Sequence, residues 1–211
     1  MSSQLTQRSL RSATRRLTAR DPDLAVVVAT HGPPPLWARE PEFHTLIHII
    51  LEQQVSLASA KAAYDRLLAA TGRLIPERFL TLRDDELKAI GFSRQKSTYG
   101  RALAEAILDG RLDLALIETL DDTDAKARLT AIKGIGSWTA DIYLLMVLRR
   151  PDTWPSGDLA LAVAVQRVKR LRKRPTPERL EKFGEAWRPW RAVAARILWH
   201  YYLSSPRQHA R

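Results

Sequence analysis

Hydrophobic positions along the chain repeat mostly at the three- to four-residue spacing of an amphipathic α-helix. Residues 41–72 show this repeat among good helix formers, but Gln53 and Gln54 interrupt it just before Val55 and Ser56. We therefore expect two helices that meet in the sequence LEQQVS. No segment has the alternating pattern and turn residues that predict a β-hairpin.

Four of the predicted helices start at residues that favour the N-cap position, because their side chains accept hydrogen bonds from free backbone N–H groups. These N-caps are Asp21, Asp84, Ser93 and Thr176. Glycines close three of these helices, at Gly32, Gly91 and Gly110. Helical patterns recur at 116–132, 137–149, 159–173 and 189–203. The pattern predicts an all-α fold of two helical lobes with a cleft between them.

Residues 1–20 differ from the rest because arginines stand there among serine, threonine and glutamine. We interpret this segment as a solvated basic N-terminal arm that is flexible, and residues 21–211 as the folded domain.

The composition points to a polyanionic partner. Lys and Arg total 34 against 23 for Asp and Glu, which gives a formal net charge of +11. Nucleic acid is the first candidate, although a basic chain is also explained by solubility alone. The absence of cysteine excludes disulfides, thiolate zinc sites and iron–sulfur clusters. No apolar run reaches the ~20 residues that span a bilayer, so we expect an intracellular, cytoplasmic protein without a membrane partner.

The sequence LTAIKGIGSWTA places Gly134 and Gly136 between two amphipathic helices, at about residues 125–149. Glycines allow positive φ and close approach, and the start of the second helix offers N–H groups that suit a phosphate. This pattern predicts a helix-hairpin-helix clamp for the DNA backbone. An ordinary turn between two helices is the alternative.

About twenty residues later, TWPSGDLALAV sets Asp158 just ahead of an apolar helix. A carboxylate at a helix N-terminus is favoured as the anion by the helix dipole and by backbone N–H donors. An anion held beside C1′ of a sugar stabilises the positive charge that develops when an N-glycosidic bond breaks. A simple N-cap remains the alternative for Asp158.

The sequences LEQQVS, GIGSWTA, WPSGDLAL and WRPWR occur here in the order found in one family. The chain resembles the helix-hairpin-helix-GPD superfamily of DNA glycosylases, and within it the 3-methyladenine DNA glycosylase II family, over roughly residues 20–203. The resemblance implies Asp158 as the catalytic carboxylate. It also implies the short, fungal-like form that lacks an N-terminal β-rich domain.

What the resemblance implies is an enzyme that flips an alkylated base, of the 3-methyladenine or 7-methylguanine type, out of duplex DNA and hydrolyses its N-glycosidic bond. Superfamily members that also cut the strand carry a lysine where this chain has Trp138, so the expected enzyme is monofunctional. Two alternatives stay open: a glycosylase for other damaged or deaminated bases, and a non-catalytic lesion-binding module.

Further site residues follow from the same comparison. Trp138 and Trp199 are the expected pocket aromatics, and Gln54 is the expected wedge that fills the gap left by the flipped base. Packing and backbone hydrogen bonding are the alternatives for them. Trp154 and the WRPWR residues Trp187, Trp190 and Arg191 are interpreted as structural. The predicted DNA contacts are Lys133, Gly134, Gly136, Ser137 and Thr139 at the hairpin, with Arg94 and Lys96 in GFSRQK.

The basic run at residues 168–174, VKRLRKR, is either solvated charge or a phosphate contact. We expect no cofactor and no metal ion; a monovalent cation at the hairpin backbone is the one candidate ion. We expect a monomer whose partner is duplex DNA with damaged bases.

Overall fold

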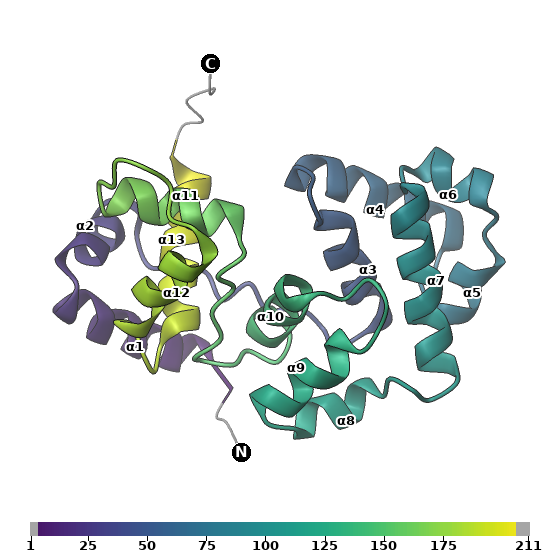
Figure 1. Cartoon of the computed structure of the whole chain (residues 1–211), viewed down its shortest axis with the longest axis horizontal. Coiled ribbons are helices and arrows are strands. Elements are labelled where there is room, and N and C mark those ends of the chain that lie inside the picture. Colours follow the sequence, from purple (N-terminus) through teal and green to yellow (C-terminus); the bar gives the residue numbers. More distant parts are fainter. Residues whose placement is uncertain (1–3, 206–211) are drawn as a thin grey trace. The chain divides into compact units, whose positions relative to one another are not determined.

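In the computed structural model, which describes residues 4–205, all regular elements of the described part are helices (Figure 1). The all-α prediction is confirmed. Contacts divide these residues into two compact units: unit 1 comprises residues 39–148, and unit 2 comprises residues 4–38 and 149–205. The chain therefore leaves unit 2 once and returns to it once.

Unit 1 holds eight consecutive helices. These are α3 (Phe43–Glu52), α4 (Leu57–Thr71), α5 (Pro76–Thr81), α6 (Asp84–Ile90), α7 (Arg94–Leu108), α8 (Leu114–Thr119), α9 (Asp122–Thr130) and α10 (Ser137–Met146). Unit 2 holds the remaining helices: α1 (Gln7–Arg20), α2 (Pro22–His31), α11 (Leu159–Val168), α12 (Pro177–Glu185) and α13 (Arg191–Ser204).

Helix α3 is the centre of unit 1 because it is apolar on most sides. Leu46, Ile47, Ile49 and Ile50 are each fully buried, and the helix packs against α4, α7 and α10. Its end at Glu52 and the start of α4 at Leu57 confirm that two helices meet in LEQQVS.

Helix α13 plays the same part in unit 2, where it packs against α1, α2, α11 and α12. Its small buried residues, Ala192, Ala194 and Ala195, allow the neighbouring helices to come close. Arg196 is also fully buried; its Nε donates to the Leu36 carbonyl at 2.9 Å and its Nη1 to the Ala192 carbonyl at 3.0 Å. Burial lowers the pKa of Arg196 to about 10.

The N-terminal segment is not the solvated arm that we expected. Residues 7–20 form α1, which Thr6 begins in a capping box with Ser9, and which packs against α2 and α13. Leu10 and Leu17 are each 1% exposed. Their seven-residue separation puts them on the helix face that packs against the rest of unit 2, while the arginines project from the other side. The prediction was wrong because it gave the charges more weight than this spacing.

Three predicted N-caps are confirmed, because Asp21, Ser93 and Thr176 each accept a backbone N–H of their own helix. The fourth was wrong by one position. Asp84 is the first residue of α6, and its N-cap is Arg83, whose N–H is bound instead by the Glu86 carboxylate at 2.7 Å. Helix α7 ends as predicted, because Gly110 follows the C-cap Asp109 with φ +76° and its N–H donates to the Ile107 carbonyl at 3.3 Å.

Candidate active site

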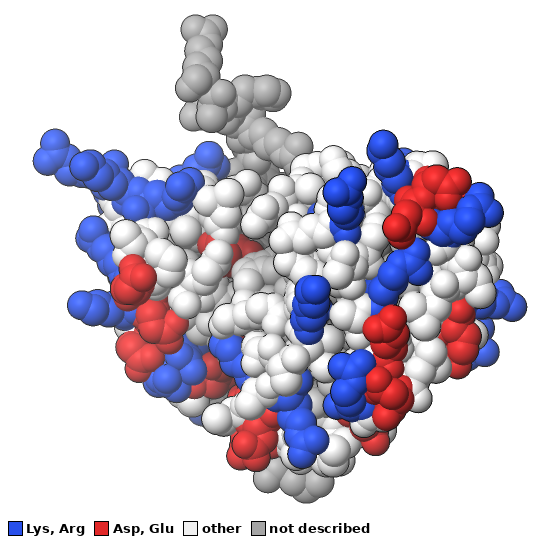
Figure 2. All heavy atoms as spheres, turned by 45° about the vertical axis from the view of Figure 1, so that its right-hand side comes forward, with Lys and Arg blue, Asp and Glu red and all other residues white. Residues whose placement is uncertain are grey.

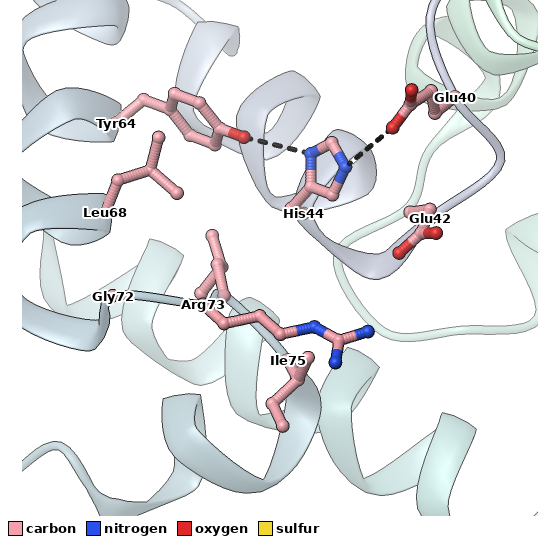
Figure 3. Close-up of a pocket in the computed structure, with 9 residues that line it drawn as sticks. Glu40, Glu42, His44, Tyr64, Leu68, Gly72, Arg73 and Ile75 are labelled. Atoms are coloured by element: carbon pink, nitrogen blue, oxygen red, sulfur yellow. Dashed lines mark hydrogen bonds and ion pairs between the residues drawn. The ribbon is translucent and has the colours of Figure 1, made fainter.

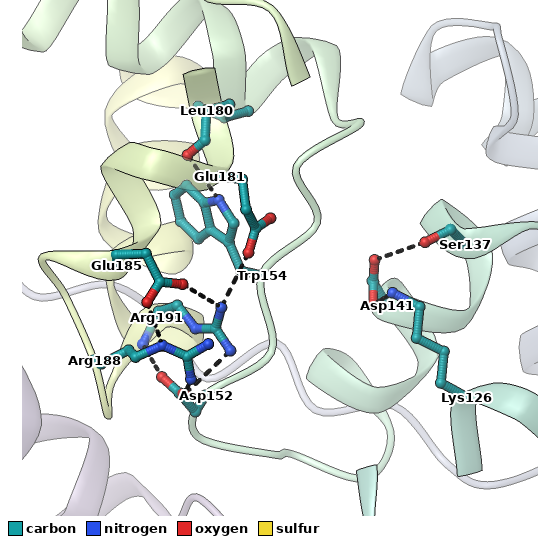
Figure 4. Close-up of polar contacts among 10 residues, drawn as sticks. All are labelled: Lys126, Ser137, Asp141, Asp152, Trp154, Leu180, Glu181, Glu185, Arg188 and Arg191. Carbon is teal, nitrogen blue, oxygen red and sulfur yellow. Dashed lines mark hydrogen bonds and ion pairs between the residues drawn. The ribbon is translucent and has the colours of Figure 1, made fainter. Parts of the chain in front are cut away.

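Asp158 is the N-cap of α11 and lies at the end of a tight turn. The Asp158 N–H donates to the Pro155 carbonyl at 2.9 Å, so the chain reverses direction immediately before the helix. The turn is anchored by Trp154, which is 5% exposed and whose indole N–H donates to the Leu180 carbonyl at 3.0 Å (Figure 4). This anchoring fixes the position of Asp158 within unit 2, and the structural interpretation of Trp154 is confirmed.

Neutral donors bind Oδ1 of the Asp158 carboxylate. Its Oδ1 accepts the Leu161 backbone N–H at 2.6 Å and the Trp199 indole N–H at 3.0 Å. Trp199 lies on α13, which packs against α11, and is 7% exposed. The structure therefore brings together two residues that the sequence marked separately, and it gives Trp199 a function that sequence reasoning missed, which is to orient the carboxylate.

Residues of the WRPWR sequence make structural contacts within unit 2, in agreement with their structural interpretation. The Trp187 indole N–H donates to Asp21 Oδ2 at 2.8 Å, and Lys169 Nζ donates to both oxygens of that carboxylate at 2.8 Å. Burial raises the pKa of Asp21, but the hydrogen bonds from Lys169 and Trp187 outweigh it, so the pKa lies below its usual value. Arg191 pairs with Asp152 at 3.2 Å (Figure 4).

The predicted hairpin joins α9 to α10 in unit 1. Gly134 has φ +95°, and a Cβ there would lie 2.2 Å from Cγ of Tyr99, so only glycine fits. Gly136 is the N-cap of α10 and faces open space, and no side chain caps this helix. These features are those of a backbone surface that can approach a phosphate closely.

Gln53 binds the hairpin from the turn between α3 and α4, a contact that sequence reasoning missed. Its Nε2 donates to the Gly134 carbonyl at 3.0 Å and to Thr139 Oγ1 at 2.9 Å. Residues more than eighty positions apart are therefore joined directly. The sequence offered only two adjacent glutamines in LEQQVS, and it gave no indication of the partner.

Gln54, the predicted wedge, is exposed and has φ +58°, a conformation that non-glycine residues adopt rarely. The same turn exposes two apolar side chains, since Val55 is 46% and Leu57 is 53% exposed. The turn thus presents a polar tip with apolar flanks, which suits insertion between bases.

The other predicted DNA contacts differ in exposure. Lys133, Gly136, Ser137 and Arg94 are exposed, and Gly134 and Trp138 are half-buried. Trp138 occupies the first turn of α10 in unit 1. The Ser137 hydroxyl donates to Asp141, which also accepts from Lys126 at 2.6 Å (Figure 4).

Thr139 does not fit the prediction that it contacts DNA. It is 1% exposed and its hydroxyl accepts from Gln53, so its role is to hold the hairpin. Lys96 has a structural partner as well: its Nζ donates to the Leu51 carbonyl at the end of α3, at 2.7 Å. Burial lowers the pKa of Lys96. Phosphate binding by Lys96 stays a prediction.

A hollow of about 340 Å³ lies between α3 and α4, and none of the predicted site residues lines it (Figure 3). His44 crosses it, with Nδ1 at 2.9 Å from the Tyr64 hydroxyl and Nε2 at 3.7 Å from Glu40. Within residues 4–205, no three His, Asp or Glu side chains form a group that could hold a metal ion. No described helix is both long and apolar enough to cross a bilayer.

Comparison with known proteins agrees with this geometry. Residues 47–189 match the HhH-GPD family, described as the superfamily of base excision DNA repair proteins. The match includes the turn of LEQQVS, the hairpin and Asp158. The chain belongs to this family.

Individual relatives show which members of the family the chain resembles. The chain is 30% identical to DNA-3-methyladenine glycosylase 1 of Schizosaccharomyces pombe over 83% of its own length and 79% of the relative. It is 26% identical to DNA-3-methyladenine glycosylase 2 of Escherichia coli over 75% of its length and 57% of the relative. The solved structure of the S. pombe 3-methyladenine DNA glycosylase in complex with abasic DNA matches with a TM-score of 0.83, covering 89% of this chain and 95% of that one.

Proposed function

We propose that this protein is a monofunctional DNA glycosylase that hydrolyses the N-glycosidic bond of alkylated bases in duplex DNA and so starts base excision repair. The observation that carries the proposal is the Asp158 carboxylate, held at the start of α11 by the Leu161 N–H and the Trp199 indole. The S. pombe and E. coli relatives are named for 3-methyladenine, which supports an alkylated purine as the substrate.

The reaction needs little from the protein beyond this anion. When the bond between C1′ and the base nitrogen breaks, its electron pair stays with the base, and the sugar becomes positively charged. Alkylation at a ring nitrogen already gives the base a positive charge, so it departs neutral without a general acid. Asp158 stabilises the charged sugar, and it orients the water that attacks C1′ and accepts the proton this water loses.

The remaining residues bind and read the DNA in this proposal. The hairpin around Gly134 and Gly136, with Lys133 and Ser137, contacts the phosphate backbone. Gln54 occupies the gap left by the flipped nucleotide. Trp138 and Trp199 provide aromatic faces for a cationic base, and Trp199 has the additional task of orienting Asp158.

The direct test is release of free base from methylated duplex DNA by the wild type and by Asp158→Asn. We expect release by the wild type and a loss of about 100-fold or more in the single-turnover rate of the variant. Binding to an abasic-site duplex should survive, because the amide keeps the shape of the side chain. No release by the wild type, or full activity of the variant, would refute the mechanism.

The monofunctional part of the proposal has its own readout. Product strands should stay intact until alkali is added, and borohydride should trap no covalent adduct between protein and DNA. Trapped adduct would show that a lysine of this chain attacks the sugar, in contradiction to the role given to Trp138.

A further inference from the structure

The segment that follows the Asp158 helix carries a dense group of basic side chains. Six of the eight residues from 167 to 174 are Lys or Arg, and none of the eight is acidic. Lys169 differs from the other five cations because it is half-buried and binds Asp21 and Asp23. The other five are exposed, and their side chains make no hydrogen bond or ion pair within residues 4–205; they are Arg167, Arg170, Arg172, Lys173 and Arg174. We call them the loop cations.

Many exposed cations elsewhere are bound to a carboxylate. In unit 1, Lys61 lies 2.6 Å from Asp65, and Arg111 lies 2.7 Å from Asp109. The space-filling view shows such red and blue neighbours, and at its upper left a group of Lys and Arg side chains that project without acidic neighbours (Figure 2). Within residues 4–205, no carboxylate forms an ion pair with the loop cations.

The backbone of this segment is well defined although its side chains are exposed. The Leu171 N–H donates to the Gln166 carbonyl at 2.8 Å and the Arg170 N–H to the Arg167 carbonyl at 3.2 Å, which closes α11 in a Schellman motif. Arg170 occupies the left-handed position of this motif, with φ +52°, where glycine is usual. Closing the helix therefore explains the backbone of the segment, but not the choice of a charged residue there.

The cations at a helix C-terminus also complement the helix dipole, and this effect needs only one or two charges in the last turn. Arg167 and Lys169 already supply them. Arg172, Lys173 and Arg174 lie beyond the helix on consecutive residues, so three like charges are confined to one short stretch of chain. A polyanion relieves the repulsion between them, and its phosphates match the guanidinium donors of arginine.

We propose that the loop cations form a second phosphate-binding surface, which contacts the backbone of the same duplex that brings the damaged nucleotide to Asp158. The location rests on the proposed function, but the phosphate binding does not. Asp158 and the loop cations stand at the two ends of α11, about 15 Å apart for ten residues. This length equals the rise of about four to five base pairs of DNA. The contacted phosphates accordingly lie within about half a helical turn of the lesion.

The test compares two variants of equal charge change. Arg172→Ala/Lys173→Ala/Arg174→Ala removes loop cations, whereas Lys61→Ala/Arg83→Ala/Arg111→Ala removes exposed cations that have carboxylate partners. Fluorescence anisotropy with undamaged and abasic-site duplexes, at 50 to 200 mM salt, gives the slope of log affinity against log salt.

We expect the loop variant to lower this slope by about 2.7, because each of the three lost phosphate contacts removes about 0.9 from the slope. Its affinity should lie furthest below that of the wild type at 50 mM salt, and the ratio of the two affinities should shrink by about 40-fold between 50 and 200 mM. The control variant should follow the wild type. A short DNA duplex with only three base pairs on either side of the abasic site, held together by DNA loops at its ends, does not reach the proposed surface. On this duplex the loop variant should bind like the wild type. Equal losses of affinity in both variants would show that net charge alone causes the effect, and would overturn the proposal. An unchanged affinity of the loop variant would also refute the second phosphate-binding surface.

The outcomes for the two proposals are separable. If the wild type releases no methylated base but the loop variant still lowers the salt slope, the phosphate surface stands and the glycosylase proposal falls. If base release is normal and the two slopes agree, only the second surface is refuted. A loop variant that loses affinity for RNA or anionic vesicles, and none for DNA, would assign these cations to a different partner and also overturn the proposal.

Discussion

The two hydrogen bonds of Gln53 give a quantitative prediction about the hairpin. Gln53→Met keeps the length of the side chain but removes the donor that binds the Gly134 carbonyl and the Thr139 hydroxyl. Each such bond contributes about 0.5–1.5 kcal/mol net. We expect the free energy of unfolding to fall by about 1–3 kcal/mol, which for a chain of this size lowers the Tm by about 2–12 °C.

We also expect DNA binding to weaken by more than the loss of folding stability explains, because Gln53 joins two parts of the predicted DNA surface. Without it, the turn that holds Gln54 is no longer bound to the hairpin. Binding to an abasic-site duplex, which needs wedge and hairpin together, should weaken more than binding to undamaged duplex. Measurements well below the Tm of the variant separate this effect from unfolding.

A double-mutant cycle isolates the bond itself. Thr139→Val removes the hydroxyl that Gln53 binds, and the double variant with Gln53→Met should lose less than the sum of the single losses, by about 0.5–1.5 kcal/mol in urea unfolding. Strict additivity, together with equal weakening of abasic and undamaged binding, would refute the idea that Gln53 couples the turn to the hairpin.

Three further predictions concern unit 1. Gly134→Ala should lower the free energy of unfolding by about 2–5 kcal/mol, because its Cβ would meet Tyr99 and its φ is positive, whereas Gly136→Ala should stay near the wild type in urea unfolding. Tyr143→Phe should raise it by about 1 kcal/mol, since the buried hydroxyl has no hydrogen-bond partner within residues 4–205; a loss would show that it has one. Burial lowers the pKa of His48, so stability should be fully present above pH 6.5 and fall as the pH drops below it, and His48→Gln should flatten the change in Tm between pH 7.5 and 5.5.

The sequence predicted most of the fold because capping and apolar spacing agreed in the longer helices. It failed where one signal was weak. Helix α1 was obscured by its arginines, although Leu10 and Leu17 mark a buried face. Helix α5, Pro76–Thr81, is too short for a clear repeat, and its place depends on Phe79, which packs where Gly100 of α7 leaves room. The local pattern of apolar residues does not reveal such packing between distant segments.

The candidate site was predictable as a set of positions but not as a set of contacts. Asp158 could be identified from its place after the hairpin, whereas its bond to Trp199, 41 residues later, depends on how α13 packs on α11. Thr139 shows the reverse case. Its position suggested DNA, and its burial under Gln53 could be seen only once α3 and α10 were known to be neighbours.

Comparison of Asp158 with the other capping aspartates explains why a capping carboxylate can have two different roles. Asp21 also caps a helix and also accepts an indole N–H, but Lys169 lies 2.8 Å from both of its oxygens, so its charge is used within the fold. The donors described at Asp158 Oδ1, a backbone N–H and the Trp199 indole, are neutral. In the proposed function, such donors orient the carboxylate, and its negative charge stabilises the positive charge that develops on the sugar. Under the proposed function, the Trp199 indole therefore orients the carboxylate without itself placing a positive charge beside it.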